Sequence, residues 1–267
     1  MVEQGPSIQG IDTSRPHPAR MYDYYLGGKD NYEIDREAAE RVIAMAPEAR
    51  PSARANRQFL RRALQHVVAR GVRQVIDIGT GIPTSPNTHE VARAVAPDVR
   101  VVYVDNDPIV ATHAEAKLTN TPGTGFLLAD ARAPRHILGH PTVRELIDFD
   151  QPVAVLLLAV LHFVRDEEDP AALVATLRDA LPAGSFLVLS HGTSDFHRAG
   201  NDANEVYRAA TASLHLRSRP AVEALFAGLD LLEPGVVQAS RWRPDPAGDG
   251  DAADDRVAFY GGVGLKR

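Results

Sequence analysis

The chain has 267 residues, of which 44% are hydrophobic, enough for one substantial core and one large α/β domain with an appendage. Its net charge of −6 shows no excess of the basic residues that typically bind nucleic acid. The absence of cysteine excludes thiol catalysis, thiolate metal sites and disulfides. No signal-peptide pattern begins the sequence, and its longest apolar run, 152–164, is too short to span a bilayer. We expect a cytoplasmic protein with a small-molecule substrate and no nucleic-acid or membrane partner.

Residues 1–70 are expected to form an N-terminal extension of the main domain, which we place at 71–267. Residues 1–19 contain three prolines and no hydrophobic periodicity, which predicts a mobile arm. Three tyrosines then fall within four residues, just before Gly27 and Gly28. Such rings either pack against the core or cover a ligand. The adjacent glycines favour a lid, with Tyr22, Tyr25 and Gly28 beside a bound cofactor.

Two helices are predicted next. Asp35 can cap a helix that runs to Ala46, and Pro51 can begin a longer helix that runs to Arg70. The second helix carries an apolar stripe at helical spacing. Four of its arginines lie largely off this stripe, and we expect them to form a solvated face: Arg54, Arg57, Arg61 and Arg62.

From Gln74 onward, short apolar strands alternate with helices. Strands are predicted over 75–78, 101–104, 126–129, 153–158 and 186–190, and helices over 88–96, 108–118, 141–147 and 170–181. Five strand–helix units imply right-handed crossovers and a doubly wound parallel sheet.

The C-terminal part breaks this alternation. A polar loop over 191–202 is followed by a helix ending near Leu214, a second helix over 220–227 and a strand over 229–237 interrupted at Pro234. An exposed acidic loop, 243–256, separates this strand from a last strand over 257–265. Because no helix crosses between these two strands, they should pair antiparallel. The fold class is therefore a seven-stranded, mostly parallel sheet.

Glycine and acidic residues follow three successive strands of this sheet. The sequence Asp77-Ile78-Gly79-Thr80-Gly81 ends the first strand, Asp105 and Asn106 end the second, and Asp130 ends the third. The carboxyl ends of parallel strands meet at one edge of a sheet, where a glycine turn lets a ligand approach the backbone. An acidic residue after the second strand can accept both ribose hydroxyls. The pattern predicts a nucleotide-like cofactor.

The residues after the glycine turn bear on which cofactor binds. Pro83 stands where a pyrophosphate-binding turn has its third glycine, and Pro86 delays the helix, which disfavours NAD and FAD. S-adenosylmethionine has no phosphate. Asp77 can then meet the methionine ammonium, directly or through water. The backbone of Gly79, Thr80 and Gly81 can approach the carboxylate and the ribose.

The adenine would lie near the third strand. Asn106 can add a hydrogen bond to the ribose, Asp130 can accept from the adenine amine, and the Ala131 backbone can meet a ring nitrogen, with Arg132 beside them. Asp130 can instead cap a turn or a helix.

Several segments together resemble a bacterial family of S-adenosylmethionine-dependent methyltransferases long catalogued as a domain of unknown function. The most distinctive is the tyrosine and double-glycine segment, residues 20–31; the others are 77–84, 89–92, 102–108, 129–132, 161–163, 189–191 and 260–264. The resemblance covers nearly the whole chain after the arm. It implies the class I methyltransferase fold and S-adenosylmethionine as cofactor, and no settled substrate.

The catalytic residues are less clearly indicated. His162 follows the fourth strand, where such folds place substrate-side groups, and an ordinary histidine pKa suits a general base. The alternative is a histidine held by backbone groups. His191, after the fifth strand, is the second candidate, and no metal site is expected.

We expect a methyltransferase acting on a small molecule at oxygen or nitrogen. The alternatives are a non-catalytic S-adenosylmethionine-binding regulator and, disfavoured by Pro83, an NAD(P)-dependent oxidoreductase.

Overall fold

The computed structural model describes residues 14–117, 121–196, 206–207, 213–245 and 256–267. Its strands are β1 (Gln74–Ile78), β2 (Arg100–Asp105), β3 (Thr124–Leu128), β4 (Ala154–Leu158), β5 (Phe186–Gly192), β6 (Asp230–Leu231), β7 (Val237–Gln238) and β8 (Phe259–Leu265). Within these ranges they form one eight-stranded sheet in the order β3-β2-β1-β4-β5-β8-β6, with β7 also paired to β8. The first five strands are parallel, and β8 runs antiparallel to β5, β6 and β7.

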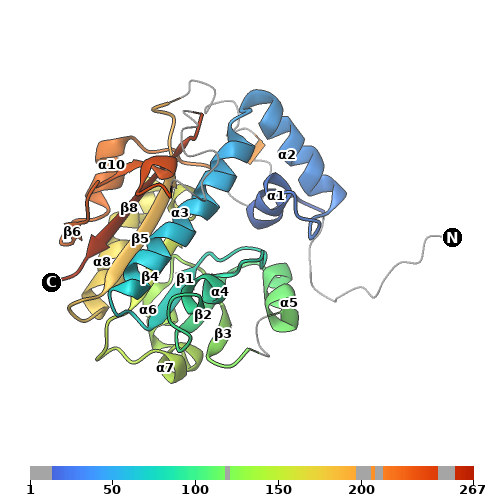
Figure 1. Cartoon of the computed structure of the whole chain (residues 1–267). Helices are drawn as coiled ribbons and strands as arrows, with labels where there is room; N and C mark the ends of the chain where they lie inside the picture. The colour runs from blue at the N-terminus through green and yellow to red at the C-terminus, as the bar shows by residue number, and fades with distance from the viewer. Residues whose placement is uncertain (1–13, 118–120, 197–205, 208–212, 246–255) are drawn as a thin grey trace.

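Helices cover both faces of the sheet (Figure 1). Helices α3 (Ala49–Ala69) and α4 (Thr88–Arg93) pack on one face. The other face is covered by α6 (Pro134–Gly139), α7 (Pro141–Leu146), α8 (Pro170–Ala180) and α10 (Arg219–Ala224). Helix α5 (Pro108–Lys117) packs beside β3, and the 3-10 turns are η1 (Leu161–Phe163), η2 (Asp166–Glu168) and η3 (Ala239–Arg241). The fold is doubly wound, as predicted.

Two further helices, α1 (Pro18–Tyr25) and α2 (Glu33–Met45), lie together beside the N-terminal half of α3 (Figure 1). Met21 and Tyr25 of α1 and Ala38 and Val42 of α2 form a separate apolar cluster there. The prediction of a mobile arm reaching Ala19 is wrong for residues 14–19, because Pro18 begins a helix and Pro16 is buried. Residues 1–13 lie outside the described part of the chain.

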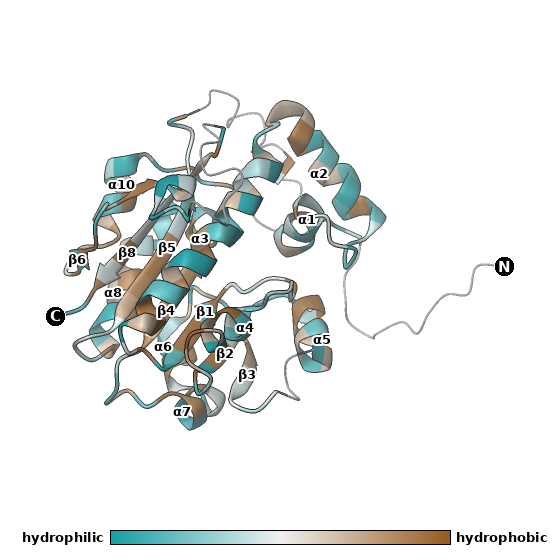
Figure 2. Cartoon of the chain, viewed as in Figure 1, coloured by the Kyte–Doolittle hydropathy of each residue, from teal (hydrophilic) through white to brown (hydrophobic). Residues whose placement is uncertain are grey.

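Hydrophobic patterning explains why α3 shares its core with the sheet. Its apolar stripe, with Phe59, Leu64 and Val67 fully buried, packs with Val75 of β1 and Val188 of β5. Figure 2 shows hydrophobic residues gathered on the strands and mixed hydrophilic and hydrophobic residues along α2 and α3. The proposed boundary at residue 70 stays a prediction, although α3 packs with the main domain.

The expected solvated face of α3 is only partly exposed. Arg62 is buried, and its guanidinium donates from Nε to the carbonyl of Trp242 at 2.9 Å and from Nη2 to that of Ala239 at 2.7 Å. A guanidinium needs several acceptors when buried, and the irregular backbone around η3 supplies free carbonyls. The prediction of a solvent-facing Arg62 is therefore wrong.

The C-terminal strands differ in detail from the prediction. The strand expected over 229–237 is broken by a turn at Pro234 and Gly235 into β6 and β7, so the sheet has eight strands among the described residues instead of seven. Helix α6, which Pro134 begins, was not predicted. Much of the polar loop, the helix expected to end near Leu214 and most of the acidic loop lie outside the described residues.

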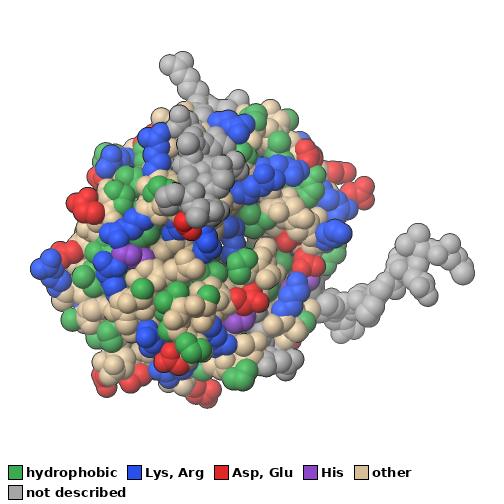
Figure 3. All heavy atoms as spheres, viewed as in Figure 1, with side chains coloured by type: hydrophobic (Ala, Val, Ile, Leu, Met, Phe, Trp, Pro, Cys, Tyr) green, Lys and Arg blue, Asp and Glu red, His purple; other side chains and the backbone are tan. Residues whose placement is uncertain are grey.

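The surface carries charges of both signs, which are spread over the face shown in Figure 3. No helix in the described ranges combines the length and the apolar character needed to cross a bilayer.

The α3–sheet core gives a stability prediction. Phe59 is fully buried and lies edge-to-face against Trp242 with ring centroids 5.5 Å apart, and its ring would lie 3.0 Å from a Cβ built on Gly261 of β8. We expect Phe59→Ala to lower the free energy of unfolding by about 3–5 kcal/mol through the cavity it leaves. Val95→Ala, at a half-exposed site after α4, should cost less than about 0.5 kcal/mol. Equal urea midpoints for the two variants would contradict this.

Candidate cofactor and acceptor site

A cavity opens at the carboxyl edge of the sheet. Its lining includes the ends of β1, β2, β4 and β5, part of β8, helix α1 and the first three turns of α3. The register of the strands explains why their ends meet at the cavity. Ile78 of β1 lies beside Val104 of β2 and Leu157 of β4, so these three strands end at the same edge of the sheet. The predicted edge site therefore coincides with a cavity.

The glycine turn after β1 forms one wall. Gly79 and Gly81 have φ values of +73° and +67°, in the left-handed region that side chains disfavour. The backbone N–H groups of Gly79 and Thr80 donate to the Val104 carbonyl at 2.7 and 3.1 Å. A Cβ on Gly79 would lie 2.2 Å from the Val160 side chain, so the close approach of the chain after β4 also requires glycine.

Asp105 fixes this turn to the end of β2. Its Oδ2 accepts from the Gly81 N–H at 2.8 Å, and its Oδ1 accepts from the Asp107 N–H at 3.0 Å. Burial raises the pKa of Asp105 to about 6, although the two backbone donors oppose the shift. The remaining lone pairs suit a pair of neutral hydroxyl donors. Asn106 also lines the cavity.

Asp77 lies in the same wall. Its Oδ2 accepts from the Thr88 hydroxyl at 2.6 Å and the Thr80 hydroxyl at 3.3 Å, and burial raises its pKa. No donor among the described residues is bonded to its Oδ1. A buried carboxylate with one free oxygen is suited to a cationic amine.

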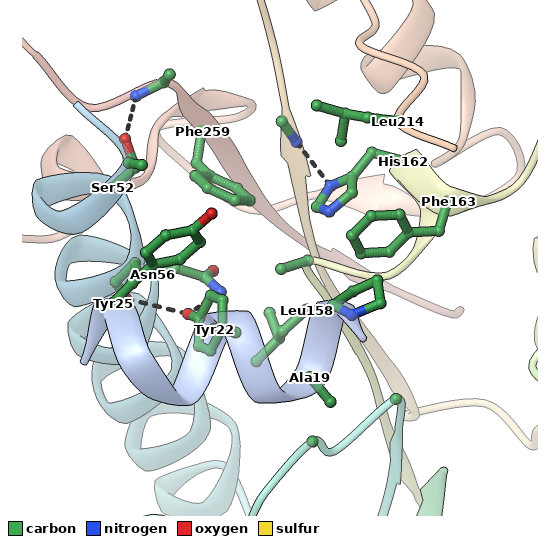
Figure 4. A pocket seen from close by; sticks show the side chains of 18 of the residues that line it. Ala19, Tyr22, Tyr25, Ser52, Asn56, Leu158, His162, Phe163, Leu214 and Phe259 are labelled. Carbon is green, nitrogen blue, oxygen red and sulfur yellow. Dashed lines mark hydrogen bonds between the residues drawn. The ribbon is translucent and has the colours of Figure 1, made fainter. Parts of the chain in front are cut away.

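The tyrosine segment was expected either to pack against the core or to cover a ligand. Tyr22 and Tyr25 line the cavity, and they also anchor α1 to other elements (Figure 4). The Tyr22 hydroxyl donates to the Ala53 carbonyl at 3.0 Å and accepts from Asn56 Nδ2 at 2.9 Å. The Tyr25 hydroxyl lies 3.2 Å from that of Tyr207. The segment is thus a docked helical wall of the cavity.

Gly28 does not line the cavity. A Cβ there would lie 2.0 Å from Oδ1 of Asp23, whose Oδ2 accepts from the Asp30 N–H and from the Asn31 amide at 3.0 and 2.7 Å. Glycine is needed because the turn closes directly over this buried carboxylate. Contact of Gly28 with a cofactor stays a prediction.

Asp130, Ala131 and Arg132 also lie outside the lining. Asp130 accepts from the backbone N–H of Arg132 at 2.8 Å and pairs with its guanidinium at 3.0 Å, so the alternative of a turn-capping residue describes its contacts. The Arg132 guanidinium also donates to the Phe163 carbonyl at 3.2 Å. Their contact with adenine stays a prediction.

Only one of the two candidate histidines reaches the cavity. His162 lines it, and its Nδ1 accepts from the Gly192 N–H at 3.2 Å. Burial, together with the neighbouring His191 and Arg217, holds the pKa of His162 well below the usual value. The neutral ring therefore carries its proton on Nε2 and has no free lone pair, which argues against the predicted general base.

His191 is fully buried away from the cavity lining. Its Nδ1 lies 2.7 Å from the Gly192 carbonyl, and its Nε2 lies 2.9 Å from the Arg217 guanidinium. Both ring nitrogens are occupied, and burial lowers its pKa to about 4. These contacts favour a structural role, and a catalytic role for His191 stays a prediction.

Sequence reasoning missed several lining residues. Ser52 and Asn56 of α3 lie one turn apart, and Asn56 Oδ1 accepts from the Ser190 hydroxyl at 2.6 Å. Both continue the apolar stripe through Phe59, and polar residues on such a face were the available signal. Arg57, expected to be solvated, also lines the cavity and donates to the carbonyls of Thr84 and Pro86. His17 and Phe259 carried no sequence signal.

Comparison with known proteins accords with this geometry. The family model for S-adenosyl methyltransferase matches residues 4–267. A DUF574 family protein from Streptomyces avermitilis is 44% identical, with a TM-score of 0.92, covering 96% of this chain and all of that one. A proposed methyltransferase from Thermobifida fusca is 38% identical, with a TM-score of 0.90, covering 97% of this chain and 98% of that one.

More distant structures share only the fold. Human N-acetylserotonin methyltransferase, crystallised with S-adenosylmethionine, is 13% identical with a TM-score of 0.50, covering 95% of this chain and 63% of its own. A search of the curated proteins gives no significant match. The class I methyltransferase fold is confirmed, and the cofactor is S-adenosylmethionine.

Asp105 provides the first test of the site. We expect Asp105→Ala to weaken S-adenosylmethionine binding by about 1–3 kcal/mol, because the ribose hydroxyls and two backbone N–H groups lose their acceptor. Asp98→Ala is the matched control, since that exposed aspartate lies just before the opposite end of β2. Isothermal calorimetry measures both. Unchanged affinity in Asp105→Ala would place the ribose elsewhere.

The raised pKa of Asp105 gives a pH prediction. The carboxyl ionises as pH rises through about 6, and the ionised form is the stronger acceptor for ribose hydroxyls. Affinity for S-adenosylmethionine should therefore increase from about pH 5 to about pH 7 and then level off. Calorimetry across this range measures the effect, and Asp105→Asn should lose most of it. An equal pH dependence in both proteins would contradict the assignment.

Proposed function

The chain belongs to the S-adenosyl methyltransferase family, and we propose that it methylates a small organic molecule at oxygen or nitrogen. The observation that carries this proposal is a single cavity that joins the Gly79 turn and Asp105 to a second region lined by tyrosine, phenylalanine and leucine side chains. Such mostly apolar, concave sites are typical of small-molecule binding. A concave, largely apolar acceptor region also favours a small molecule over nucleic acid.

The residues fit S-adenosylmethionine at its ammonium and at its ribose. The glycine turn leaves room for its methionine portion, Asp77 offers a free carboxylate oxygen, and Asp105 offers acceptors for the ribose. In the reaction, an acceptor lone pair forms the bond to the methyl carbon, the carbon–sulfur electron pair stays on sulfur, and the acceptor proton goes to solvent. The chain's contribution is to hold the acceptor in line and to exclude water from the reacting atoms.

A non-catalytic S-adenosylmethionine-binding regulator is the second candidate. It is favoured by the hydrogen bond at His162 Nδ1, which leaves that ring without a basic nitrogen. An NAD(P)-dependent oxidoreductase is not proposed, because the family cofactor is S-adenosylmethionine. A cytoplasmic location stays a prediction.

The two candidates differ in a transfer experiment. The protein is incubated with methyl-labelled S-adenosylmethionine and the small-molecule fraction of a cell extract, and labelled products are separated by chromatography. We expect a labelled product that Gly79→Ala abolishes, because the added Cβ would meet Val160 at 2.2 Å. Gly71→Ala is the control. Gly71 also has a positive φ, +99°, but a Cβ built on it has no atom within 4 Å, so this substitution adds backbone strain without a steric clash. Cofactor binding without any labelled product would favour the regulator.

A further inference from the structure

The acceptor side of the cavity has a distinct chemistry. We use the term acceptor chamber for the space bounded by Tyr25, Leu158, His162, Phe163, Leu214 and Phe259, whose side chains surround it in Figure 4. Aromatic and aliphatic surfaces of this kind suit a flat, apolar ring, because they bury its faces without leaving polar groups unpaired.

No member of the acceptor chamber carries a charge at neutral pH. Of the other charged lining residues, Asp77 and Asp105 belong to the cofactor side, and Arg57 is held by two backbone carbonyls. His17 lies 3.0 Å from Asp107, and Glu48 is partly exposed to solvent. Among the residues that the structure describes, a cationic amine or a carboxylate would therefore find no buried counter-ion in the chamber, at high cost. The chamber favours an uncharged acceptor.

His162 supplies a polar group inside this apolar space. Its Nδ1 is directed to the Gly192 N–H, which places the proton of the neutral ring on Nε2. Its ring lies against the Phe163 ring, with centroids 4.4 Å apart, and faces the chamber in Figure 4. The site thus presents a fixed N–H donor to whatever occupies the chamber.

The groups packed around His162 keep it neutral. His191 lies 5.6 Å away between ring centroids and accepts from Arg217, which pairs with Asp166. The backbone of His215 donates to the His162 carbonyl at 2.7 Å, and Phe259 brings no charge. Because of burial, His191 and Arg217, the pKa of His162 lies well below the usual value. The Tyr25 hydroxyl, whose pKa burial raises, also stays protonated.

Resting on the proposed methyl transfer, we propose that the acceptor is an uncharged aromatic compound methylated at a phenolic oxygen, and that His162 donates its Nε2–H to the phenolate instead of removing the proton. The phenol loses its proton to water, and the phenolate oxygen then forms the bond to the methyl carbon while the electron pair of the broken bond remains on sulfur. A neutral donor stabilises the phenolate and so lowers the pKa of the bound phenol.

The test measures that pKa directly, without turnover. The probe is 7-hydroxycoumarin, whose absorbance changes on ionisation, bound to the full-length protein saturated with S-adenosylhomocysteine. We expect His162→Phe, which keeps a ring but removes the donor, to raise the pKa of the bound probe by about one unit or more. His162→Gln keeps an amide oxygen for the Gly192 N–H and an N–H for the probe, so it should retain much of the shift. His136→Gln, an exposed histidine of α6, is the control and should change nothing.

Different results would overturn the donor role of His162, the phenolic acceptor and the proposed function. Equal probe pKa values in the wild type, His162→Phe and His162→Gln would overturn the donor role. Weaker binding of 7-hydroxycoumarin than of 7-aminocoumarin or coumarin-3-carboxylate, or no binding of any of them, would overturn the phenolic acceptor. Calorimetry with S-adenosylhomocysteine is run on every variant: failure of the wild type to bind it would refute the proposed function itself, whereas binding without probe binding refutes this inference alone.

Discussion

The buried carboxylate of Asp105 is the contact on which the site depends. It accepts from the backbone of Gly81 after β1 and of Asp107 after β2, so it holds two loops of neighbouring strands in one conformation. Its burial disfavours the charge, and its two backbone donors restore part of that loss. The protein's own backbone groups therefore fix the orientation of this side chain.

The second constraint is the way the N-terminal helices complete the cavity. A chain of hydrogen bonds runs from the Ala53 carbonyl through Tyr22 and Asn56 to Ser190, connecting α1, α3 and the end of β5. These groups are polar and largely buried, so each requires its partner. Docking of α1 thus couples the wall over the cofactor to the strand that borders the acceptor chamber. The same residues that close the cavity also hold the extension on the sheet.

The parts of the fold that could be predicted are those governed by local patterns. The apolar strands and the prolines at helix starts, such as Pro108 and Pro170, gave the elements and their order. The edge rule for parallel strands then brought Asp77, Gly79 and Asp105 together. The antiparallel C-terminal strands followed from the absence of a helix between them.

What could not be predicted depends on contacts distant in sequence. The burial of Arg62 follows from carbonyls near residue 240, about 180 positions away, which no local pattern encodes. The interruption at Pro234 was predicted, but the separate pairing of β6 and β7 with β8 depends on contacts with the C-terminal end of the chain. The N–H that occupies His162 belongs to Gly192, on another strand. A general base was the natural expectation for an isolated histidine, and only the folded arrangement shows a neutral donor.

A hydrogen-bond donor at His162 and a general base at the same position place different requirements on the site. A base must be deprotonated with an accessible lone pair, whereas a donor need only stay neutral, which a low-dielectric site enforces at no further cost. The features that count against His162 as a base are its burial, the nearby Arg217 and the engaged Nδ1, and the same features keep the proton of the neutral ring on Nε2. The proton of the bound phenol can then pass to solvent, and His162 need not accept it. The site's task becomes the stabilisation of an anion at a fixed position.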